Sequence, residues 1–135
     1  MDELFRAIAG HLRTLGYTAI IEEGIVKATH PQNAAFWVVP INGGALFRAL
    51  FVKGRNADAD ELGYLRFLAQ ANRMSIVSRF SDVGDMLSVE AWFPNCLDQS
   101  MIGNFFARYL LDISAPVQSD LAGVQRYFPP PPAAR

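Results

Sequence analysis

Only a few side chains in this sequence are of the types that catalysis or metal binding uses. His11 and His30 are the only histidines, and no helical spacing joins them to each other or to a pair of carboxylates. Cys96 is the only cysteine, and no basic residue near it in the sequence would favour its thiolate. Zinc binding or nucleophilic catalysis would need His11 or His30 beside a carboxylate or Cys96 in one cleft. We therefore predict no catalytic residues and no metal site.

The acidic and glycine-containing motifs are explained by local structure. Asp58, Asp60 and Glu61 stand where a helix should begin, and Asp58 with Glu61 has capping-box spacing. The segment 82–85, Asp-Val-Gly-Asp, is too short for a calcium loop and has the composition of a turn. Gly43-Gly44 lacks the Lys-Ser/Thr pair of a phosphate-binding loop, so we interpret it as a hairpin turn. No cofactor is expected.

Composition narrows the class of protein. The chain has 135 residues, which suits a single domain, and its 51% hydrophobic and 19% charged residues exclude a disordered chain. The net charge is −1 and the twelve Lys and Arg are scattered, which argues against a nucleic-acid partner. No apolar run approaches the ~18–20 residues that span a bilayer, and the acidic start is unlike a signal peptide. With its single cysteine, the protein is expected to be cytoplasmic and to have no membrane partner.

Hydrophobic periodicity predicts helices and strands in a definite order. The expected helices cover about residues 2–15, 56–73 and 97–114, and Pro116 should end the last one. The expected strands cover residues 17–22, 25–29, 36–39 and 46–53, followed by a hairpin over residues 75–93. The order is α-β-β-β-β-α-β-β-α, or one strand fewer if the first two form one bent strand.

This order predicts an α+β fold. The sheet should be a twisted antiparallel sheet of five to six strands with helices packed on one face. We expect a single domain over residues 1–115 and a proline-rich tail over residues 116–135, with polyproline II structure at residues 129–132 that is held against some surface.

Two details of this prediction concern the later hairpin and the second helix. A turn centred on Val83-Gly84 would pair Phe80 with Leu87. Arg79 would then lie diagonally from Glu90 on the outer side of the hairpin, where the two could form an ion pair. The expected buried stripe of the second helix is Leu62, Leu65, Leu68 and Ala69, widened by Tyr64, Phe67 and Ala71.

Residues 36–52 are apolar on both faces of the strands that they form. A half-solvated strand would instead alternate apolar and polar residues. The helices can cover one face, and we expect a second copy, a partner peptide or the C-terminal tail to cover the other. The candidate residues for this partner-binding or dimer surface are Phe36, Trp37, Phe47, Phe51 and Trp92.

Several of these motifs resemble the YbjN-like family, whose members are labelled as candidate bacterial sensory-transduction regulators. The resemblance rests on Leu15-Gly16-Tyr17, on residues 68–73 ending in Asn72-Arg73, on the hairpin residues 80–90, and on Trp92-Phe93-Pro94. It covers residues 2 to about 114. It implies a fold similar to that of class I type III secretion chaperones, frequent dimerisation and no catalytic residues to carry over. Those chaperones bind an extended partner segment, and this chain differs from them in its near-neutral charge and its proline-rich tail.

The leading hypothesis is a non-enzymatic, chaperone-like or regulatory protein. It would form a homodimer and bind an unidentified partner protein or an extended peptide segment, most naturally by edge-strand addition. The alternative is a small-molecule-binding domain with its ligand pocket between sheet and helices, which a deep pocket with convergent polar groups would favour. An enzyme is the third possibility, through the histidine and cysteine contacts named above.

Overall fold

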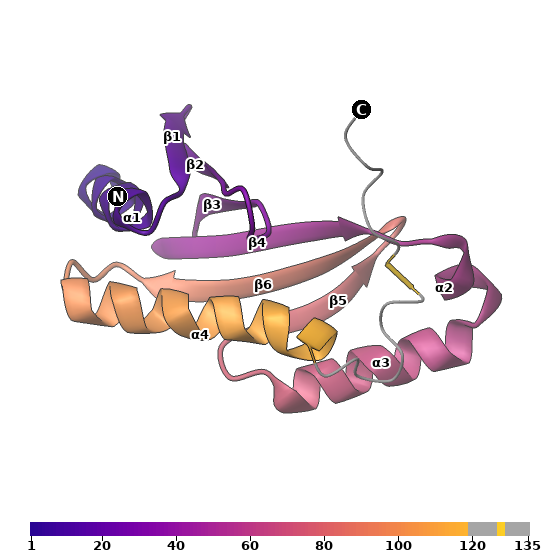
Figure 1. Cartoon of the computed structure of the whole chain (residues 1–135). Coiled ribbons are helices and arrows are strands. Elements are labelled where there is room, and N and C mark those ends of the chain that lie inside the picture. Colours follow the sequence, from indigo (N-terminus) through magenta and orange to yellow (C-terminus); the bar gives the residue numbers. More distant parts are fainter. Residues whose placement is uncertain (119–126, 129–135) are drawn as a thin grey trace.

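The computed structural model describes residues 1–118 and 127–128, with residues 117 and 118 described by their backbone alone. Figure 1 shows the arrangement of its helices and strands. In chain order these are α1 (Asp2–Thr14), β1 (Thr18–Glu22), β2 (Ile25–Thr29), β3 (Phe36–Ile41), β4 (Gly44–Val52), α2 (Arg55–Ala59), α3 (Glu61–Met74), β5 (Arg79–Val83), β6 (Met86–Pro94) and α4 (Gln99–Gln118).

The strands form one six-stranded antiparallel sheet in the spatial order β1-β2-β3-β4-β6-β5. This confirms the predicted α+β architecture at the larger of the two strand numbers. The first two strands are a hairpin rather than one bent strand, because Glu23 and Gly24 both adopt positive φ and close a two-residue turn. The second predicted helix is divided into α2 and α3 at Asp60.

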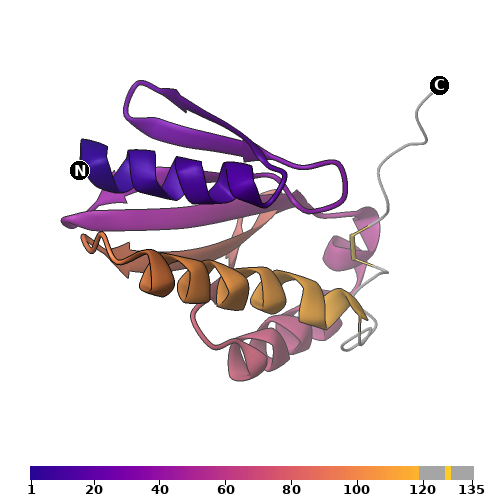
Figure 2. The same ribbon diagram turned by 60° about the vertical axis from the view of Figure 1, so that its left-hand side comes forward.

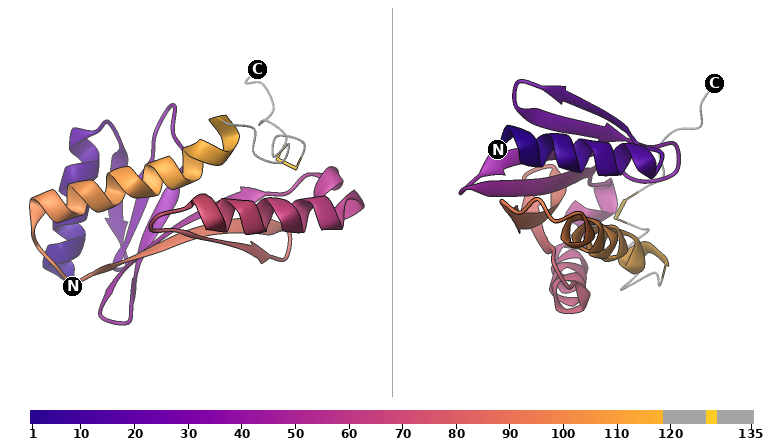
Figure 3. Two further views of the ribbon diagram at one scale, coloured as in Figure 1. Left: turned by 90° about the horizontal axis from the view of Figure 1, so that it is seen from below. Right: turned by 90° about the vertical axis from the view of Figure 1, so that its left-hand side faces the viewer.

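The helices form a layer on one face of the sheet, which we call the inner face. Figures 2 and 3 show α1 and α4 side by side, with α3 on the other side of α4. The core lies between this layer and the inner face. Phe36 and Phe47 stack there with ring centroids 5.7 Å apart, and Phe106 and Tyr109 of α4 pack against both rings.

Helix α3 buries only part of the predicted stripe: Leu68 and the three residues that widened it are buried, whereas Leu62, Leu65 and Ala69 are exposed. Leu62 and Leu65 are 60% and 49% exposed. The helical repeat brings apolar residues to two neighbouring stripes, and the stripe with the larger aromatic side chains occupies the core. The N-cap is Asp60 rather than Asp58, and its side chain accepts the N–H of Gly63. The buried residues of α3 are Tyr64, Phe67, Leu68 and Ala71.

The β5–β6 hairpin has a register two residues away from the predicted one. Val83 pairs with Met86, so the turn is residues 84–85, and Phe80 pairs with Val89 instead of Leu87. A two-residue turn with Gly84 at a φ of 63° closes the hairpin. Phe80 still faces the core as predicted, because a shift of two residues preserves the face of a strand.

Two side chains from the helix layer hold β5 and the segment before it. Buried Asp112 of α4 accepts the backbone N–H groups of residues 76–78, each at 2.9 Å. Asn72 of α3 pairs with Phe80, donating from Nδ2 to its carbonyl at 2.8 Å and accepting its N–H at 2.7 Å. These contacts satisfy backbone groups that have no strand partner on that side.

The end of the described chain packs against the corner between α2 and α3. Tyr127 is buried, its hydroxyl donates to Asp60 Oδ2 at 2.9 Å, and its carbonyl accepts the N–H of Gly54 at 2.7 Å. A Cβ at residue 63 would overlap the Tyr127 hydroxyl, which explains Gly63 inside a helix. The predicted polyproline segment, residues 129–132, lies outside the described residues.

Helix α4 continues past Pro116 to Gln118, whereas Pro116 was predicted to end it. A proline lacks the backbone N–H, so Pro116 removes one hydrogen bond of the helix. Because the helix ends two residues later, the loss affects only its last turn. The helix thus crosses the predicted boundary between residues 115 and 116, and the division into a domain and a tail stays a prediction.

Candidate functional site

The sheet face opposite the helix layer, which we call the outer face, is the candidate site. Strand residues alternate between the two faces, so the neighbours of the core residues lie on the outer face. Trp37 is 51% exposed and Trp92 is 45% exposed. The exposed large apolar residues of this face are Ile20, Trp37, Ile41, Leu50, Val52, Val83 and Trp92.

A line of side chains crosses the outer face at right angles to the strands, with one residue from each strand. We call it the charged row, and the strand register sets its order as Ile20, Lys27, Trp37, Arg48, Glu90 and Arg79. The outer face is therefore less apolar than the two-sided apolarity of residues 36–52 predicted. Charged side chains occupy the middle of the face, and exposed apolar side chains lie on both sides of them.

The charges of this row have partners within the chain. Glu90 is the centre of one group, because Arg48 approaches its carboxylate at 3.4 Å, Arg79 at 3.9 Å and the Ser88 hydroxyl at 2.9 Å. The predicted ion pair between Arg79 and Glu90 is thus formed, with the two residues directly opposite each other rather than diagonal.

Lys27 forms the second charged group of the row. Its ammonium lies 2.9 Å from Glu22 Oε2 and 5.8 Å from the centroid of the Trp37 ring. The hydrogen bond and the charge of Glu22 raise the pKa of Lys27, so it carries a full positive charge. The Trp37 ring therefore sits between the cations of Lys27 on one side and Arg48 on the other.

Trp92 is held rigidly beside the β3–β4 turn. Its indole Nε1 donates to the Ile41 carbonyl at 2.8 Å. A Cβ at residue 44 would overlap both the Trp92 ring and the Phe93 carbonyl, so Gly44 creates the space into which the ring packs. An aromatic side chain with its polar group already bonded presents an ordered apolar surface at little entropic cost.

The structure separates the five predicted contact residues into two groups. Trp37 and Trp92 lie exposed on the outer face. Phe36 and Phe47 are buried on the inner face, so they cannot contact a partner and are removed from the candidate surface. Phe51 also faces inward, where it is half-buried and lines a small cavity. The sequence showed that these strands are apolar, but it did not show which face the helices cover.

Both edges of the sheet carry side chains on their outward backbone groups. On β1, Arg13 donates from Nε and Nη2 to the Ala19 carbonyl at 3.1 and 2.7 Å. On β5, Asn72 occupies both groups of Phe80. Such contacts obstruct the addition of another strand, so the expected edge-strand mode is less favoured than binding to the outer face.

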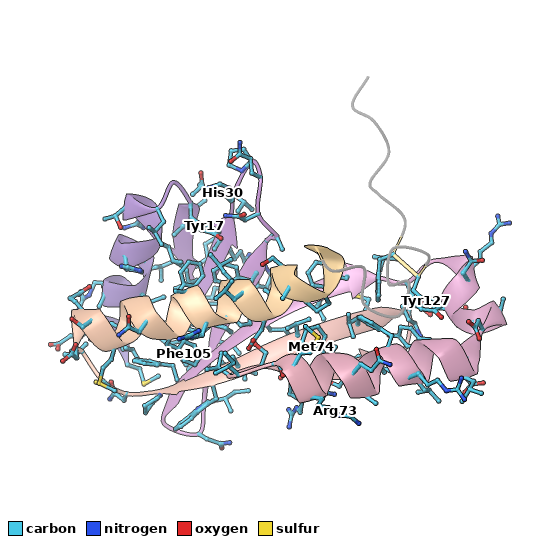
Figure 4. The ribbon with its side chains drawn as sticks, turned by 60° about the horizontal axis from the view of Figure 1, so that its bottom comes forward. Tyr17, His30, Arg73, Met74, Phe105 and Tyr127 are labelled. Carbon is cyan, nitrogen blue, oxygen red and sulfur yellow. The ribbon has the colours of Figure 1, made fainter. Side chains whose placement is uncertain are left out.

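The side chains that could do chemistry lie apart and have structural roles. The His30 ring packs on Tyr17 with centroids 4.7 Å apart (Figure 4), and its Nδ1 accepts the N–H groups of residues 32 and 33. His11 contacts Phe106 edge-on. Cys96 is half-buried, with its Sγ 3.7 Å from the sulfur of Met101. Within residues 1–118 and 127–128, no group of three metal-ligating side chains is assembled.

The space enclosed between the sheet, α3 and α4 is small. A cavity of about 80 Å³ lies among apolar side chains of the sheet, α3 and α4, with Phe51, Phe67 and Phe128 in its wall. Ligand pockets typically measure roughly 300–1,000 Å³ and contain a few convergent polar groups. A larger hollow of about 370 Å³ lies where α1 begins, between Phe5, Ile21 and Pro40, but it is open to solvent. A hollow of about 660 Å³ lies between α4, Phe51 and residues 32–34, and it is more open still. Its size is in the range of ligand pockets, but it is a shallow surface hollow rather than the deep pocket that the small-molecule alternative would need.

Comparison with known proteins identifies the fold. No family model matches the sequence, and no curated protein matches it. The crystal structure of YbjN from E. coli, described as a candidate transcription regulator, matches with a TM-score of 0.70 at 15% identity, over 93% of this chain and 95% of that chain. The chain thus has a YbjN-like fold, as its motifs indicated. None of the helices in the described part of the chain is long and apolar enough to cross a bilayer.

Proposed function

We propose that this protein is a non-enzymatic binding module of regulatory or chaperone-like type, which forms a homodimer and binds a partner protein. The observation that carries the proposal is the outer face, with two tryptophans and several large aliphatic side chains in water. Burying apolar surface contributes roughly 25 cal/mol per Å², and exposed patches of this kind usually mark protein contacts.

A second exposed apolar surface supports the presence of two binding partners. The side of α3 that faces away from the sheet carries Leu62 and Leu65, with Arg66 and Arg73 exposed on the same side. We call it the α3 surface. Because α3 covers the inner face, this surface and the outer face point away from each other. One can bind a second copy while the other binds a partner segment with apolar and acidic side chains.

The fold supports the same class of function. YbjN is described as a candidate transcription regulator. A regulator that acts through protein contacts needs specific surfaces rather than a catalytic cleft, and the outer face and the α3 surface are of that kind. We place the protein in the bacterial cytoplasm, where its single free cysteine would stay reduced.

Sedimentation velocity and light scattering test the homodimer, and a capture experiment tests the partner. Immobilised protein would be exposed to native cytosol as the unmodified chain and as the variants Leu65→Ser and Leu15→Ser. Leu15 is exposed to a similar extent at the far end of α1, so it is the matched control. We expect one or more proteins to be lost with Leu65→Ser and retained with Leu15→Ser. A strictly monomeric protein whose captured set is the same in all three forms would refute the proposal.

A further inference from the structure

The corner between α2 and α3 holds two residues from the far end of the chain, Tyr127 and Phe128 (Figure 4). We call these two residues the anchor, and the pocket that holds them the anchor site. The anchor site is formed by Gly54, Asp60, Gly63, Tyr64 and Phe67.

We propose that the anchor site binds an extended peptide in which a tyrosine is followed by a second aromatic residue. The anchor occupies the site in the free protein, and a partner segment of the same chemistry displaces it. This inference rests on the proposed binding of a partner protein, and it adds a specific site, its ligand class and its regulation.

The anchor site recognises Tyr127 through its side chain and its backbone together. The hydroxyl donates to Asp60 Oδ2 at 2.9 Å, and the carbonyl accepts the N–H of Gly54 at 2.7 Å. Asp60 is itself fixed as the N-cap of α3, because its Oδ1 accepts the N–H of Gly63 at 3.1 Å. Backbone hydrogen bonds combined with a side-chain pocket are a common way of binding extended peptides.

The tyrosine ring fills a space that the sequence keeps open. Tyr127 is buried, and its ring centroid lies 5.7 Å from that of Tyr64 and 6.4 Å from that of Phe67. A Cβ at residue 63 would overlap both the Tyr127 hydroxyl and the Asp60 carboxylate. Glycine within a helix is unfavourable relative to alanine, so Gly63 indicates that room for this hydroxyl is needed.

Phe128 closes the apolar end of the anchor site. Its half-buried ring lies 5.9 Å from that of Phe67 and 6.2 Å from that of Tyr64, and it forms part of the wall of the 80 Å³ cavity. Departure of the anchor would open this cavity and leave an apolar pocket with the Asp60 carboxylate and the Gly54 N–H directed into it. Apolar pockets with a few convergent polar groups are the usual form of a ligand site.

The anchor site is continuous with the α3 surface, which favours a partner protein as the second occupant. Leu62 and Leu65 are exposed on the first two turns of α3, next in sequence to Gly63 and Tyr64 of the anchor site. Two anchor residues bind only weakly by themselves, and the chain keeps them in place at an effective concentration on the order of 1 mM. A partner that also covers the α3 surface makes additional contacts and therefore displaces the anchor at a lower concentration.

Fluorescence anisotropy with a labelled peptide tests the site. The peptide has the sequence of residues 124–133, and the protein is the full chain with Tyr127→Ala and Phe128→Ala, which empties the site. We expect a dissociation constant of about 1 mM or lower, because a weaker contact would leave the anchor displaced in the unmodified chain. The unmodified chain should bind the peptide about tenfold more weakly, since its own anchor competes. No binding to the folded double variant at about 5 mM peptide would overturn the proposal.

Changes in the peptide test whether the tyrosine is recognised. Replacing Tyr127 of the peptide, Tyr127→Phe, should weaken binding about tenfold, because Asp60 Oδ2 loses its donor. A phosphate on this tyrosine should abolish binding, because it sets negative charge against the Asp60 carboxylate. Equal affinity of all three peptides would show nonspecific association of a proline-rich sequence and would overturn the proposed recognition.

Two glycine substitutions in the double variant test the position of the site. Gly63→Ala should abolish peptide binding, because its Cβ occupies the space of the hydroxyl. Gly10→Ala is the matched control, since Gly10 lies within α1 with open space around its Cα, and it should leave the affinity unchanged. Binding that survives Gly63→Ala would place the peptide elsewhere and contradict the proposal.

A milder variant keeps the proposal testable if circular dichroism shows the double variant to be unfolded. Tyr127→Phe in the full chain retains the ring and loses only the hydrogen bond to Asp60. The tyrosine peptide should then bind this variant more tightly than it binds the unmodified chain, because the anchor that it displaces is weaker. Equal binding to both chains would overturn the proposal.

Sedimentation of the unmodified chain mixed with the double variant tests the identity of the second occupant. We expect no more association than in the unmodified chain alone, because an anchor in its own site is not available to another. A complex specific to the mixture would assign the site to the anchor of a second copy and overturn its assignment to a partner protein.

The outcomes separate this inference from the proposed function. Capture that depends on Leu65, together with a peptide that does not bind, would refute the anchor site and leave the proposed partner binding standing. A monomeric chain whose captured set is unchanged by Leu65→Ser would refute the proposed function, whereas tyrosine-dependent peptide binding would still establish the anchor site.

Discussion

The two faces of the sheet come from the same six strands, yet they have opposite environments. Phe36 and Trp37 are consecutive aromatic residues. Phe36 is buried in the core, whereas about half of the Trp37 side chain is exposed to solvent. The difference arises because α1, α3 and α4 cover only the inner face (Figure 3). Hydrophobicity of a strand residue therefore does not decide its burial. The placement of the helices does.

The largest expected effect tests this contrast at the two neighbouring positions. Phe36→Ala should lower the free energy of unfolding by about 3–5 kcal/mol, because it opens a cavity among closely packed rings. Trp37→Ala should lower it less, by about 1–2 kcal/mol in dilute monomer, since half of the side chain is already in water. Chemical denaturation followed by circular dichroism measures both values.

The same pair of variants also sharpens the dimer proposal. With increasing protein concentration, the stability deficit of Trp37→Ala should grow, since association stabilises only the chain that can dimerise. The deficit of Phe36→Ala should show no such growth from the loss of an interface contact. Equal effects of the two substitutions in dilute solution would contradict the assignment of these residues to opposite faces.

The second expected effect compares a carboxylate in the helix layer with one on the outer face. Asp112→Ala should cost about 3 kcal/mol, because three backbone N–H groups lose their acceptor in a buried place. Glu22→Ala, which breaks an exposed pair with Lys27, should have no measurable effect. Amide hydrogen exchange at residues 76–78 should accelerate in Asp112→Ala alone. Unchanged protection there would show that Asp112 does not hold this segment.

The sequence predicted the elements of the fold better than the contacts between them. The order of elements followed from periodicity and turn residues, and the division of the later hairpin into two faces survived an error of two residues in its register. The buried stripe of helix α3 was predicted too wide, because its two neighbouring apolar stripes are equally valid by period and only the packing against the sheet decides between them. Phe36 and Phe47 were misplaced for a related reason, since an apolar strand does not reveal which face is covered.

Some contacts of the fold and of the outer face had no signal in the sequence. Nothing marked Asp112 as the acceptor for a segment more than thirty residues earlier in the chain. Asn72 was noted as part of a motif, but its pairing with Phe80 is a tertiary contact. The charged row likewise depends on the register of all six strands, which local patterns do not set.

The third expected effect compares the two edges of the sheet. Asn72→Ala should cost about 1–2 kcal/mol, since both backbone groups of Phe80 lose their partner. Arg13→Ala should cost less, because it frees one carbonyl on an exposed edge that water can reach. Hydrogen exchange at the Phe80 amide and thermal unfolding would measure the difference. If Arg13→Ala were the more damaging variant, β1 rather than β5 would be the edge that depends on its side-chain partner.

The smallest expected effect comes from a polar group on the buried side, and its pH dependence appears only in alkali. The Tyr109 hydroxyl is buried and donates to the Val89 carbonyl at 2.8 Å. Burial raises the pKa of Tyr109 above its usual 10.0. Below pH 10 the protonated Tyr109 makes its full contribution to the free energy of unfolding. Above pH 10 the tyrosine ionises in the unfolded chain while it stays protonated in the folded chain. The free energy of unfolding then falls by about 1.4 kcal/mol for each further pH unit.

Tyr109→Phe isolates that contribution from the other tyrosines, because burial also raises the pKa of Tyr17 and Tyr64. The variant should be about 1 kcal/mol less stable at pH 8, where the hydrogen bond to Val89 is lost. Between pH 10 and 11 its free energy of unfolding should fall less steeply than that of the unmodified chain. Equal slopes would mean that the Tyr109 hydroxyl ionises at the same pH in the folded and the unfolded chain. Burial on the inner face would then have no effect on its pKa, as expected of a hydroxyl in contact with solvent on the outer face.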